Sequence, residues 1–533
     1  MSALRDIELR RAYDIAVFGS GFAGSLMAMI ARRQGHSVVL LERGNHPRMA
    51  IGESSTPLAN LLLEDLAVRY DLQAIRPLVK WGSWQRTYPH LACGLKRGFT
   101  FYHHELAGND KFDPDHLNQL LVAASPHDEI ADTHWYRADF DSFLVDQAQA
   151  LGVDYLDEAT VDRFVERQDE VSFDVSKNGE TIKIRACFAI DATGPRGLLH
   201  RAVGLPEGSL PDYPATQALY SHFSGVQRPH ASMEQNNRQA PPYPAEDAAV
   251  HHVFDGGWIW VLRFNNGLTS AGVAATAEAS IRLNLRESAP AWWRLVDSIP
   301  TLKEQFATAR AEAPFTFVPK VAFLSGRVCG DRWAMLPSAA GFVDPLLSTG
   351  FPLTLLGIDR IAEIIDHHWR SANFSSQLEA YASKTCEELL ATSQLIGSLY
   401  ANTNNFGVFK AISLLYFAAA SYSETARRLG KPHLAQSFLL QDDTAFGPAC
   451  RDLLERSKHL TSEQESTQLI GDILRVIEPF DVAGLSDPDR RSWYPVEAED
   501  LLRSASKVQS TREEIERLLQ RCGFYSAQQA WEL

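Results

Sequence analysis

The stretch from Tyr13 to Arg43, YDIAVFGSGFAGSLMAMIARRQGHSVVLLER, constrains the fold of this chain more than any other. A short apolar run at Ile15 to Phe18 leads into Gly19-Ser-Gly-Phe-Ala-Gly24. A helix-forming stretch and a second apolar run, Ser37 to Leu41, follow. A strand, a glycine turn, a helix and a strand in this order are typical of a βαβ unit that binds a dinucleotide. The alternative is a glycine turn that binds nothing.

The glycines of this unit have separate roles in nucleotide binding. Gly19 permits the tight turn, Gly21 lets the backbone approach a pyrophosphate, and Gly24 lets the helix pack closely on the strand. The first turn of the helix presents free N–H groups and a positive dipole end to phosphates. Glu42 lies eighteen residues after Gly24, near the spacing at which an acid accepts a hydrogen bond from a ribose hydroxyl. The predicted cofactor contacts in this unit are Gly19, Gly21, Ala23, Gly24, Glu42 and Arg43.

Length, charge and cysteine use exclude several classes of protein. At 533 residues the chain exceeds one simple core, so two or three closely packed subdomains are expected. A net charge of −15 argues against binding of nucleic acid. The six cysteines are scattered, which favours reduced thiols in a cytoplasmic enzyme over disulfides or a metal site. The N-terminus does not resemble a secretory signal, and the longest apolar candidate for a membrane span, around Ile412 to Ala420, is too short.

Three loops are predicted to lie beside the cofactor. Gly52 to Pro57, with Glu53, Ser54 and Ser55, either lies against a flat ring system or only caps the following helix. A strand predicted at Ile182 to Ile190 runs into Asp191-Ala-Thr-Gly194, which resembles the turn with which flavoproteins approach FAD a second time. Further on, Asp344-Pro345 precedes the turn Ser348-Thr349-Gly350, whose N–H groups would face a small anion or the flavin ring.

Alternation from Leu95 to His104 predicts one strand with two different faces. With a period of two, Lys96 and His104 share a face, while Phe99 and Phe101 lie on the opposite, core-facing side. Lys96 and His104 would then project together towards solvent or a cavity, and a solvated lysine is the commoner case.

A second strand, around His251 to Asn266, carries two large rings. A period of two places Trp258, Trp260 and Leu262 on one face, where the two indoles form a rigid apolar wall. The alternative is an ordinary packed sheet core.

Together these segments resemble the FAD-dependent monooxygenase superfamily and, within it, the flavin-dependent halogenases, above all the branch that acts on phenols and pyrroles. They span about two thirds of the chain in the family's order. The segments that carry the resemblance are Gly19 to Gly24, His46 to Arg48, Gly52 to Pro57, Gly94 to His104, Tyr136 to Asp141, His251 to Val261, Phe264 to Asn266 and Asp344 to Gly350.

The resemblance implies a fold and its division along the chain. The expected fold class is α/β (α+β), with a Rossmann-like FAD-binding domain of the aromatic-hydroxylase type, an interleaved antiparallel sheet on the substrate side, and a helical C-terminal region. The FAD-binding domain would comprise residues 1–90, 131–205 and 324–370. The substrate-side sheet would comprise 91–130 and 206–323, and the helical region 371–533.

The resemblance also implies a reaction. Reduced FAD and O2 would give a C4a-hydroperoxide, which oxidises chloride or bromide to hypohalous acid, and Lys96 would direct that acid to an electron-rich phenol, pyrrole or indole. Trp258 and Trp260 would keep the substrate away from the flavin, and Ser348, Thr349 and Gly350 would hold the halide. His104 is the candidate base for the ring proton, although a solvated histidine is an equally good interpretation. The remaining implied FAD contacts are Glu53, Ser54, Ser55, Arg137, Asp191, Gly194, Asp344 and Pro345.

Two questions stay open at this point. The family's WxWxIP signature reads Trp-Ile-Trp-Val-Leu262-Arg263 here, so the loss of proline and the gain of a charge leave room for a flavin monooxygenase that hydroxylates its substrate and uses NAD(P)H. A chain that only binds FAD is the third hypothesis. The single GxGxxG motif suggests that a separate reductase supplies the reduced flavin, and the substrate is either free or tethered to a carrier protein.

Overall fold

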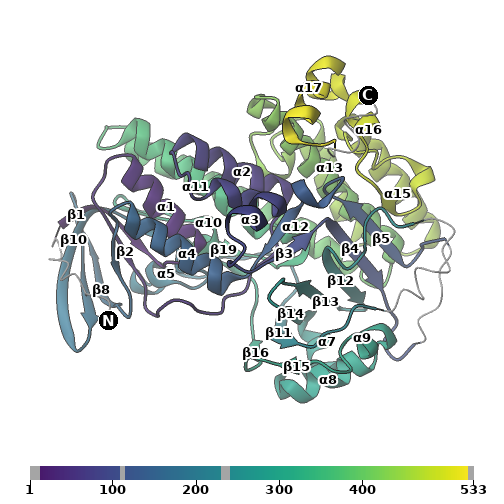
Figure 1. Ribbon diagram of the computed structural model, residues 1–533, viewed down its shortest axis with the longest axis horizontal. Helices are drawn as coiled ribbons and strands as arrows, with labels where there is room; N and C mark the ends of the chain where they lie inside the picture. Colours follow the sequence, from purple (N-terminus) through teal and green to yellow (C-terminus); the bar gives the residue numbers. More distant parts are fainter. Residues whose placement is uncertain (1–11, 109–114, 230–239, 526–533) are drawn as a thin grey trace.

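The computed structural model describes residues 12–108, 115–229 and 240–525, and two sheets organise them (Figure 1). Figure 1 shows the first sheet at the left, the second at the right, and the C-terminal helices above the second. The first sheet has the order β7-β2-β1-β10-β9-β8, and β18 also pairs with β10. Its strands are β1 (Ala12–Phe18), β2 (Val38–Leu41), β7 (Asp154–Leu156), β8 (Thr160–Glu166), β9 (Val171–Lys177), β10 (Glu180–Asp191) and β18 (Trp333–Met335).

The first sheet combines a parallel and an antiparallel part. Strand β1 pairs in parallel with β2 and β10, while β9 pairs antiparallel with β10 and β8. Because parallel strands are covered on both faces, the run from Ile15 to Phe18 is fully buried. Helices α1 (Phe22–Arg33), α4 (Arg137–Ala150) and α11 (Gly350–His368) lie beside this sheet (Figure 1), and α2 (Pro57–Arg69) packs against α11. The βαβ unit predicted from the glycine motif is therefore confirmed.

The second sheet has the order β15-β11-β14-β13-β12-β4-β5-β20, and β16 also pairs with β11. Most neighbouring strands are antiparallel, but β12 pairs in parallel with β4, and β20 with β5. The last strand, β20, comes from the far C-terminal part of the chain. The strands are β4 (Gly98–His103), β5 (Gln119–Ala123), β11 (Thr216–Ser224), β12 (Ala249–Phe254), β13 (Gly257–Arg263), β14 (Leu268–Thr276), β15 (Arg310–Ala311), β16 (Thr316–Val318) and β20 (Trp493–Tyr494).

The single strand predicted from Leu95 to His104 is wrong, because the chain breaks at Arg97. Strand β3 (Cys93–Lys96) pairs with β6 (Asp132–Trp135) in a separate two-stranded ribbon, and β4 begins only at Gly98. The Arg97 backbone N–H donates to the Asp247 carbonyl at 2.6 Å, outside both ladders, while the Arg97 carbonyl accepts from the Ala124 N–H at 2.7 Å. The period of two therefore does not continue across the break.

The remaining elements fill the space around the two sheets. Short helices α7 (Ala277–Arg282), α8 (Ala289–Asp297) and α9 (Pro300–Gln305) lie below the second sheet in Figure 1. Other short elements are α3 (Trp81–Thr87), α5 (Leu198–Ala202), α10 (Pro337–Ala340), β17 (Phe323–Leu324) and β19 (Gly341–Phe342).

The C-terminal region is mainly helical, as predicted. Its helices are α12 (Phe374–Ala401), α13 (Phe406–Arg428), α14 (Phe446–Ser457), α15 (Glu463–Ile477), α16 (Ala498–Arg503) and α17 (Arg512–Cys522). Contrary to the expectation that no segment is long enough, α13 has the length and apolar character to cross a membrane. However, 78% of its most apolar window is buried inside the protein, as in the core helix of a soluble protein. The three-part division of the chain stays a prediction.

Candidate active site

A cavity of about 910 Å³ lies between the two sheets and is lined by residues of both. The turn after β1, the turn after β10 and the start of α11 contribute to its wall from the first sheet, and β11 and β13 contribute from the second. Predicted cofactor residues that line it are Gly19, Gly21, Ala23, Glu42, Arg43, Glu53, Ser54, Arg137, Gly194, Asp344 and Pro345. Their role as cofactor contacts stays a prediction.

The glycine turn forms a cradle in which a side chain has no room. A Cβ on Gly24 would lie 1.8 Å from the Gly19 carbonyl oxygen, so α1 packs directly on the turn. Gly19 has φ +90°, and a Cβ there would lie 2.7 Å from the Ala192 carbonyl oxygen. Gly24 does not itself line the cavity and acts through packing. This close backbone approach fits a pyrophosphate at the start of α1.

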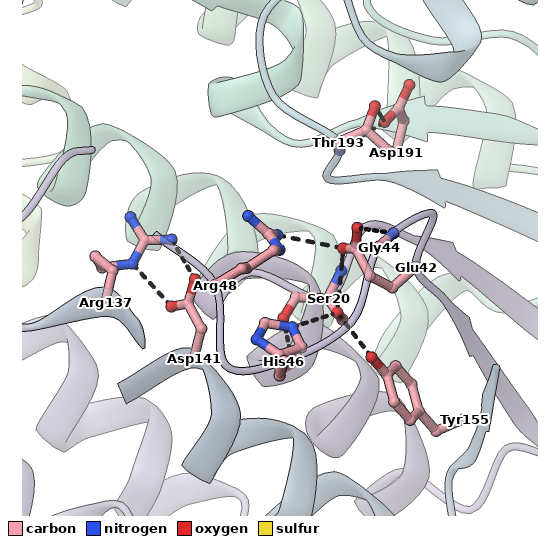
Figure 2. Close-up of polar contacts among 11 residues, drawn as sticks. Ser20, Glu42, Gly44, His46, Arg48, Arg137, Asp141, Tyr155, Asp191 and Thr193 are labelled. Atoms are coloured by element: carbon pink, nitrogen blue, oxygen red, sulfur yellow. Dashed lines mark hydrogen bonds and ion pairs between the residues drawn. The ribbon is translucent and has the colours of Figure 1, made fainter. Parts of the chain in front are cut away.

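Glu42 is fixed at the edge of the cavity (Figure 2). Its Oε2 accepts hydrogen bonds from the Ser20 N–H at 3.0 Å and the Arg48 guanidinium at 3.2 Å, and its Oε1 accepts from the Gly44 N–H at 3.0 Å. Burial raises the pKa of Glu42, but the backbone hydrogen bonds and Arg48 outweigh it and lower the pKa overall. Glu42 is therefore an ionised acceptor, as a ribose hydroxyl requires.

Arg137, at the start of α4, holds the loop before α2 (Figure 2). Its guanidinium binds both carboxylate oxygens of Asp141, at 2.8 and 2.7 Å, and donates to the Gly52 carbonyl at 2.9 Å. The buried ion pair thus fixes the position of Glu53 and Ser54 in the wall.

Asp191 and Ser55 do not face the cavity, which corrects their prediction as cofactor contacts. The Asp191 carboxylate accepts from the Thr193 N–H at 2.8 Å and the Leu199 N–H at 2.6 Å, so it closes its own turn (Figure 2 shows Asp191 and Thr193). The Ser55 hydroxyl donates to the Thr133 carbonyl at 2.8 Å. Both residues shape the wall from behind.

Asp344 lines the cavity and also anchors a buried network. Its Oδ2 accepts from the hydroxyls of Tyr213 at 2.6 Å and Tyr400 at 3.0 Å, and its Oδ1 accepts from the Leu346 N–H at 2.9 Å. The indole N–H of Trp258 donates to the Tyr400 hydroxyl at 3.0 Å. Burial raises the pKa of Asp344 to about 6 against these hydrogen bonds. The network joins the turn before α11, a strand of the second sheet and helix α12.

The turn from Ser348 to Gly350 lines the cavity directly before α11. Leu347 and Ser348 have φ values of 62° and 55°, a conformation that is costly for residues other than glycine. Both side chains are buried, so the surrounding structure imposes this turn. The start of a 19-residue helix therefore faces the cavity, where its dipole favours an anion.

Trp258 and Trp260 share one face of β13 and line the cavity together with Leu262, as predicted. Their ring centroids lie 5.7 Å apart with the planes at 48°. Opposite Trp260, a Cβ on Gly272 would lie 2.4 Å from the indole ring, so β14 leaves room for that ring. Strand β13 stays regular to Arg263, whose guanidinium binds Glu246 at 2.9 Å and does not reach the cavity.

Lys96 lies one side chain behind the cavity wall. Its side chain has no exposed surface, and Nζ donates to the Ser54 hydroxyl at 2.9 Å and to the Ser55 carbonyl. The ammonium also lies 3.8 Å from the centroid of the Phe99 ring, although the sequence had placed Phe99 on the opposite face. The break at Arg97 explains this difference. Lys96 is neither solvated nor in the cavity; Ser54 joins it to the cavity.

The structure does not bring His104 to Lys96. The His104 ring lies 2.9 Å from the ring of His252, Nε2 to Nδ1, and the two rings are stacked. His251, the neighbour of His252 on β12, has its ring against Phe101 and Trp258 instead, on the side of Lys96. Alternate residues of a strand point to opposite faces, so His104 lies across the sheet from Lys96. The predicted shared face is wrong.

Sequence reasoning missed several side chains of the wall. Basic groups at Arg48, Arg196, Arg201 and Lys320 join Arg43 around the cavity. Glu53, which was predicted, has its Oε1 2.7 Å from Nε2 of His222, a buried partner that was not predicted. Of the basic groups, Arg48 lies in the segment His46 to Arg48 and Arg196 lies two residues after the turn Asp191 to Gly194, whereas Arg201 and Lys320 come from segments without a motif. The basic groups suit a pyrophosphate, which completes the fit of this cavity to FAD.

Metal ligands were not predicted, and the described residues contain no group of three or more His, Cys, Asp or Glu side chains that could hold a metal ion. All six cysteines fall within the described ranges and are free thiols, as expected.

Comparisons with known proteins agree on one family. The family described as Tryptophan halogenase matches residues 14–407. Tetracycline 7-halogenase of Kitasatospora aureofaciens is 26% identical over 77% of this chain and 74% of its own length. Monodechloroaminopyrrolnitrin halogenase PrnC of Pseudomonas fluorescens is 27% identical over 76% of this chain and 70% of its own length.

Solved structures show the same fold. Halogenase PltM, in complex with phloroglucinol and FAD, superposes with a TM-score of 0.76 at 23% identity, over 90% of this chain and 99% of its own. The flavin-dependent brominase Bmp2 superposes with a TM-score of 0.59 at 19% identity, over 83% of this chain and 97% of its own.

Proposed function

We infer that this protein halogenates an electron-rich aromatic ring beside Lys96. The premise is that the chain belongs to the tryptophan halogenase family and is a flavin-dependent halogenase that uses FAD and a halide. A phenol, a pyrrole or an indole is the proposed substrate. The observation that carries this proposal is the buried ammonium of Lys96, held one residue behind a cavity whose wall includes Trp258 and Trp260.

FAD, when bound in reduced form, would supply the two electrons that activate O2, and O2 is the oxidant of the halide. The chain's own residues supply separation and aim. The two indoles form an apolar part of the cavity wall on the side of the second sheet. Their proposed role is to keep a substrate ring away from the flavin. Ser54 connects the cavity to Lys96, so a small neutral oxidant such as hypohalous acid has hydrogen-bonding groups along its way.

The chemistry proposed for Lys96 is proton transfer and orientation. Its ammonium donates a hydrogen bond to the oxygen of hypohalous acid while the ring carbon attacks the halogen. The carbon–halogen bond forms, the oxygen–halogen bond breaks, and the oxygen leaves as water with the lysine proton. The amine then takes up the proton that the ring loses, which restores the ammonium. His104, on the other face of the sheet, is not needed as the base.

We propose that the halide is held by the turn Ser348, Thr349 and Gly350. Support comes from its place in the cavity wall and at the start of α11. The remaining parts of the proposal are a separate flavin reductase as electron donor and a cytoplasmic location. Two relatives act on 1H-pyrrole-2-carbonyl groups on a peptidyl-carrier protein, as their names state, so the substrate assay includes carrier-bound as well as free rings.

Direct hydroxylation is not favoured by the relatives, and one assay separates it from halogenation. The protein is incubated with reduced FAD, O2 and bromide or chloride, and with phenols, pyrroles and indoles, and the products are read by mass. Halogen incorporation is expected; oxygen insertion without halogen would overturn the proposal.

Lys96→Ala tests the role of the ammonium. We expect halogenation to fall by about 100-fold or more, the range for loss of a general acid, while FAD binds with unchanged affinity because Lys96 does not line the cavity. Lys177→Ala is the matched control, because its ion pair with Asp157 lies on the outer part of the first sheet. Retained halogenation in Lys96→Ala would remove Lys96 from the mechanism.

A further inference from the structure

A carboxylate lies opposite Lys96 on the two-stranded ribbon. Strand β3 pairs antiparallel with β6, and in this register Lys96 faces Asp132 directly. Directly opposed residues point to the same side of an antiparallel pair, with Cβ atoms about 5 Å apart. Lys96 has no exposed surface and Asp132 is 6% exposed, so the two charged side chains are buried side by side.

Asp132 has one oxygen engaged and one open. Its Oδ1 accepts a hydrogen bond from the Asn60 side-chain amide at 2.7 Å, from helix α2. Its buried Oδ2 has no hydrogen-bond partner within residues 12–108, 115–229 and 240–525. A buried carboxylate oxygen without a donor is costly unless a cation stands close by. Lys96 is that cation.

The surroundings of Lys96 leave Asp132 as its counter-charge. Ser54 and Ser55 provide neutral oxygen acceptors, and the Phe99 ring provides a π face. Burial lowers the pKa of both nearby histidines, His134 and His251, to about 3, so these rings are neutral. Of the charged groups, Asp132 acts directly on Lys96. The other groups that act on Asp132 are Glu424, Arg428 and Tyr416 from α13.

We propose that Asp132 is a positioning residue, the counter-ion that keeps Lys96 charged and aimed at the site of halogenation. This inference rests on the proposed function, in which the Lys96 ammonium takes part in the reaction. Asp132 touches neither the cavity nor, in this role, the substrate; it acts through Lys96.

The physical need for such a partner follows from burial. Desolvation lowers the pKa of Lys96 and raises the pKa of Asp132, and in each case burial favours the uncharged form. Their mutual attraction opposes both shifts, and two groups this close titrate as one unit. Without the carboxylate, burial alone would act on Lys96, and the ammonium would lose its proton at a lower pH.

The first test is the pH profile of halogenation in Asp132→Asn. Asparagine keeps the shape and the oxygen that accepts from Asn60, and it removes only the charge. We expect the alkaline limb of the profile to move to lower pH by about one unit or more. This is the usual effect of losing an opposite charge next to the titrating group. Asp132→Glu should restore the wild-type limb, because it restores the charge.

The matched control is Glu388→Gln. Glu388 is as deeply buried, and its carboxylate binds Arg360 at 2.7 Å between α11 and α12, away from the cavity wall. It should lower the melting temperature without moving the pH profile. An alkaline limb in Asp132→Asn that coincides with the wild type would overturn the inference.

The second test does not depend on activity. Melting temperatures are measured for the wild type, Asp132→Asn, Lys96→Met and the double variant. If the two side chains form a pair, the double variant loses less than the sum of the two single losses, because each single change leaves one buried charge alone. Should Asp132→Asn fail to fold, a folded double variant supports the pair and an unfolded one overturns it.

The two proposals fail in different ways. Retained halogenation in Lys96→Ala would overturn the role of Lys96 without any Asp132 variant. Strictly additive losses in the cycle would overturn the role of Asp132 and leave the role of Lys96 standing.

Discussion

The cavity and the Lys96 compartment lie next to each other, yet they are built on opposite principles. Backbone forms much of the cavity: glycines without room for a Cβ, a strained turn and the starts of helices. Mainly side chains form the Lys96 compartment: the ammonium donates to the Ser54 hydroxyl and the Ser55 carbonyl, lies over the Phe99 ring, and stands on the strand pair opposite the Asp132 carboxylate. Backbone suits a large cofactor that is always the same, whereas buried side-chain charge suits a proton-transfer step. Ser54 belongs to both regions.

A substitution that distorts the cavity but leaves the Lys96 compartment unchanged should have the largest effect, and this effect is on FAD binding. Gly24→Ala places a methyl group against the Gly19 carbonyl, a clash at 1.8 Å that only a backbone shift relieves. We expect a loss of about 2–3 kcal/mol, which corresponds to roughly 100-fold weaker FAD binding. Flavin fluorescence titration measures it. Gly471→Ala, where no atom lies within 4 Å of the new Cβ, is the control and should bind FAD normally. Equal affinities in the two variants would contradict the cradle.

The Asp344 network, at the border of the two regions, predicts a pH-dependent stability. An aspartate in an unfolded chain titrates near 3.9, whereas Asp344 in the folded protein has a pKa of about 6. Between these values the folded state binds more protons, so stability falls as pH rises from about 4 to about 6. The loss is about 3 kcal/mol.

Asp344→Asn lacks this titration and serves as the reference. The difference between the melting temperature of the wild type and that of Asp344→Asn should therefore shift in favour of the wild type as the pH falls from 7 to 4. All other acids contribute equally to both proteins. If the melting temperatures of the two proteins changed in parallel with pH, the raised pKa of Asp344 in the folded protein would be contradicted.

The smallest expected effect concerns the link between Trp258 and the network. Tyr400→Phe leaves the Trp258 indole N–H without its acceptor, a cost of about 1 kcal/mol. We expect halogenation to fall about fivefold by the same energy scale, with FAD affinity unchanged. Tyr422→Phe loses a similar hydrogen bond, to the Lys507 carbonyl at 3.1 Å, outside the site and is the control. A halogenation rate of Tyr400→Phe equal to that of Tyr422→Phe would show that the hydrogen bond from Trp258 to Tyr400 does not affect the reaction.

The same contrast explains how much could be predicted from the sequence. Local patterns determine the cavity: the glycine turn, the period of β13 and the helix after Gly350 each follow from a few consecutive residues. The flavin-dependent halogenase family and its FAD were therefore predicted correctly. The compartment depends on tertiary pairing. No pattern marks the break at Arg97, which follows from a hydrogen bond to Asp247, and no motif contains Asp132.

Asp191 illustrates the limit from the other side. It stands in the expected place at the end of β10, but its carboxylate is used by the N–H groups of its own turn. Sequence position predicted the turn correctly and the direction of the side chain wrongly, because neighbours eight residues away decide which hydrogen bonds an aspartate makes.

Strand β20 has a consequence for the way the chain is made. Trp493–Tyr494 pairs with β5, at the end of the sheet that also contains β13 and its two tryptophans. The ribosome therefore releases β5 more than 350 residues before β20, and the edge of β5 that pairs with β20 stays unpaired until β20 has been made. Uncovered strand edges pair readily with other chains. The second sheet is therefore complete only after Trp493 and Tyr494 have been made, and truncation before Trp493 would leave a strand edge open to aggregation.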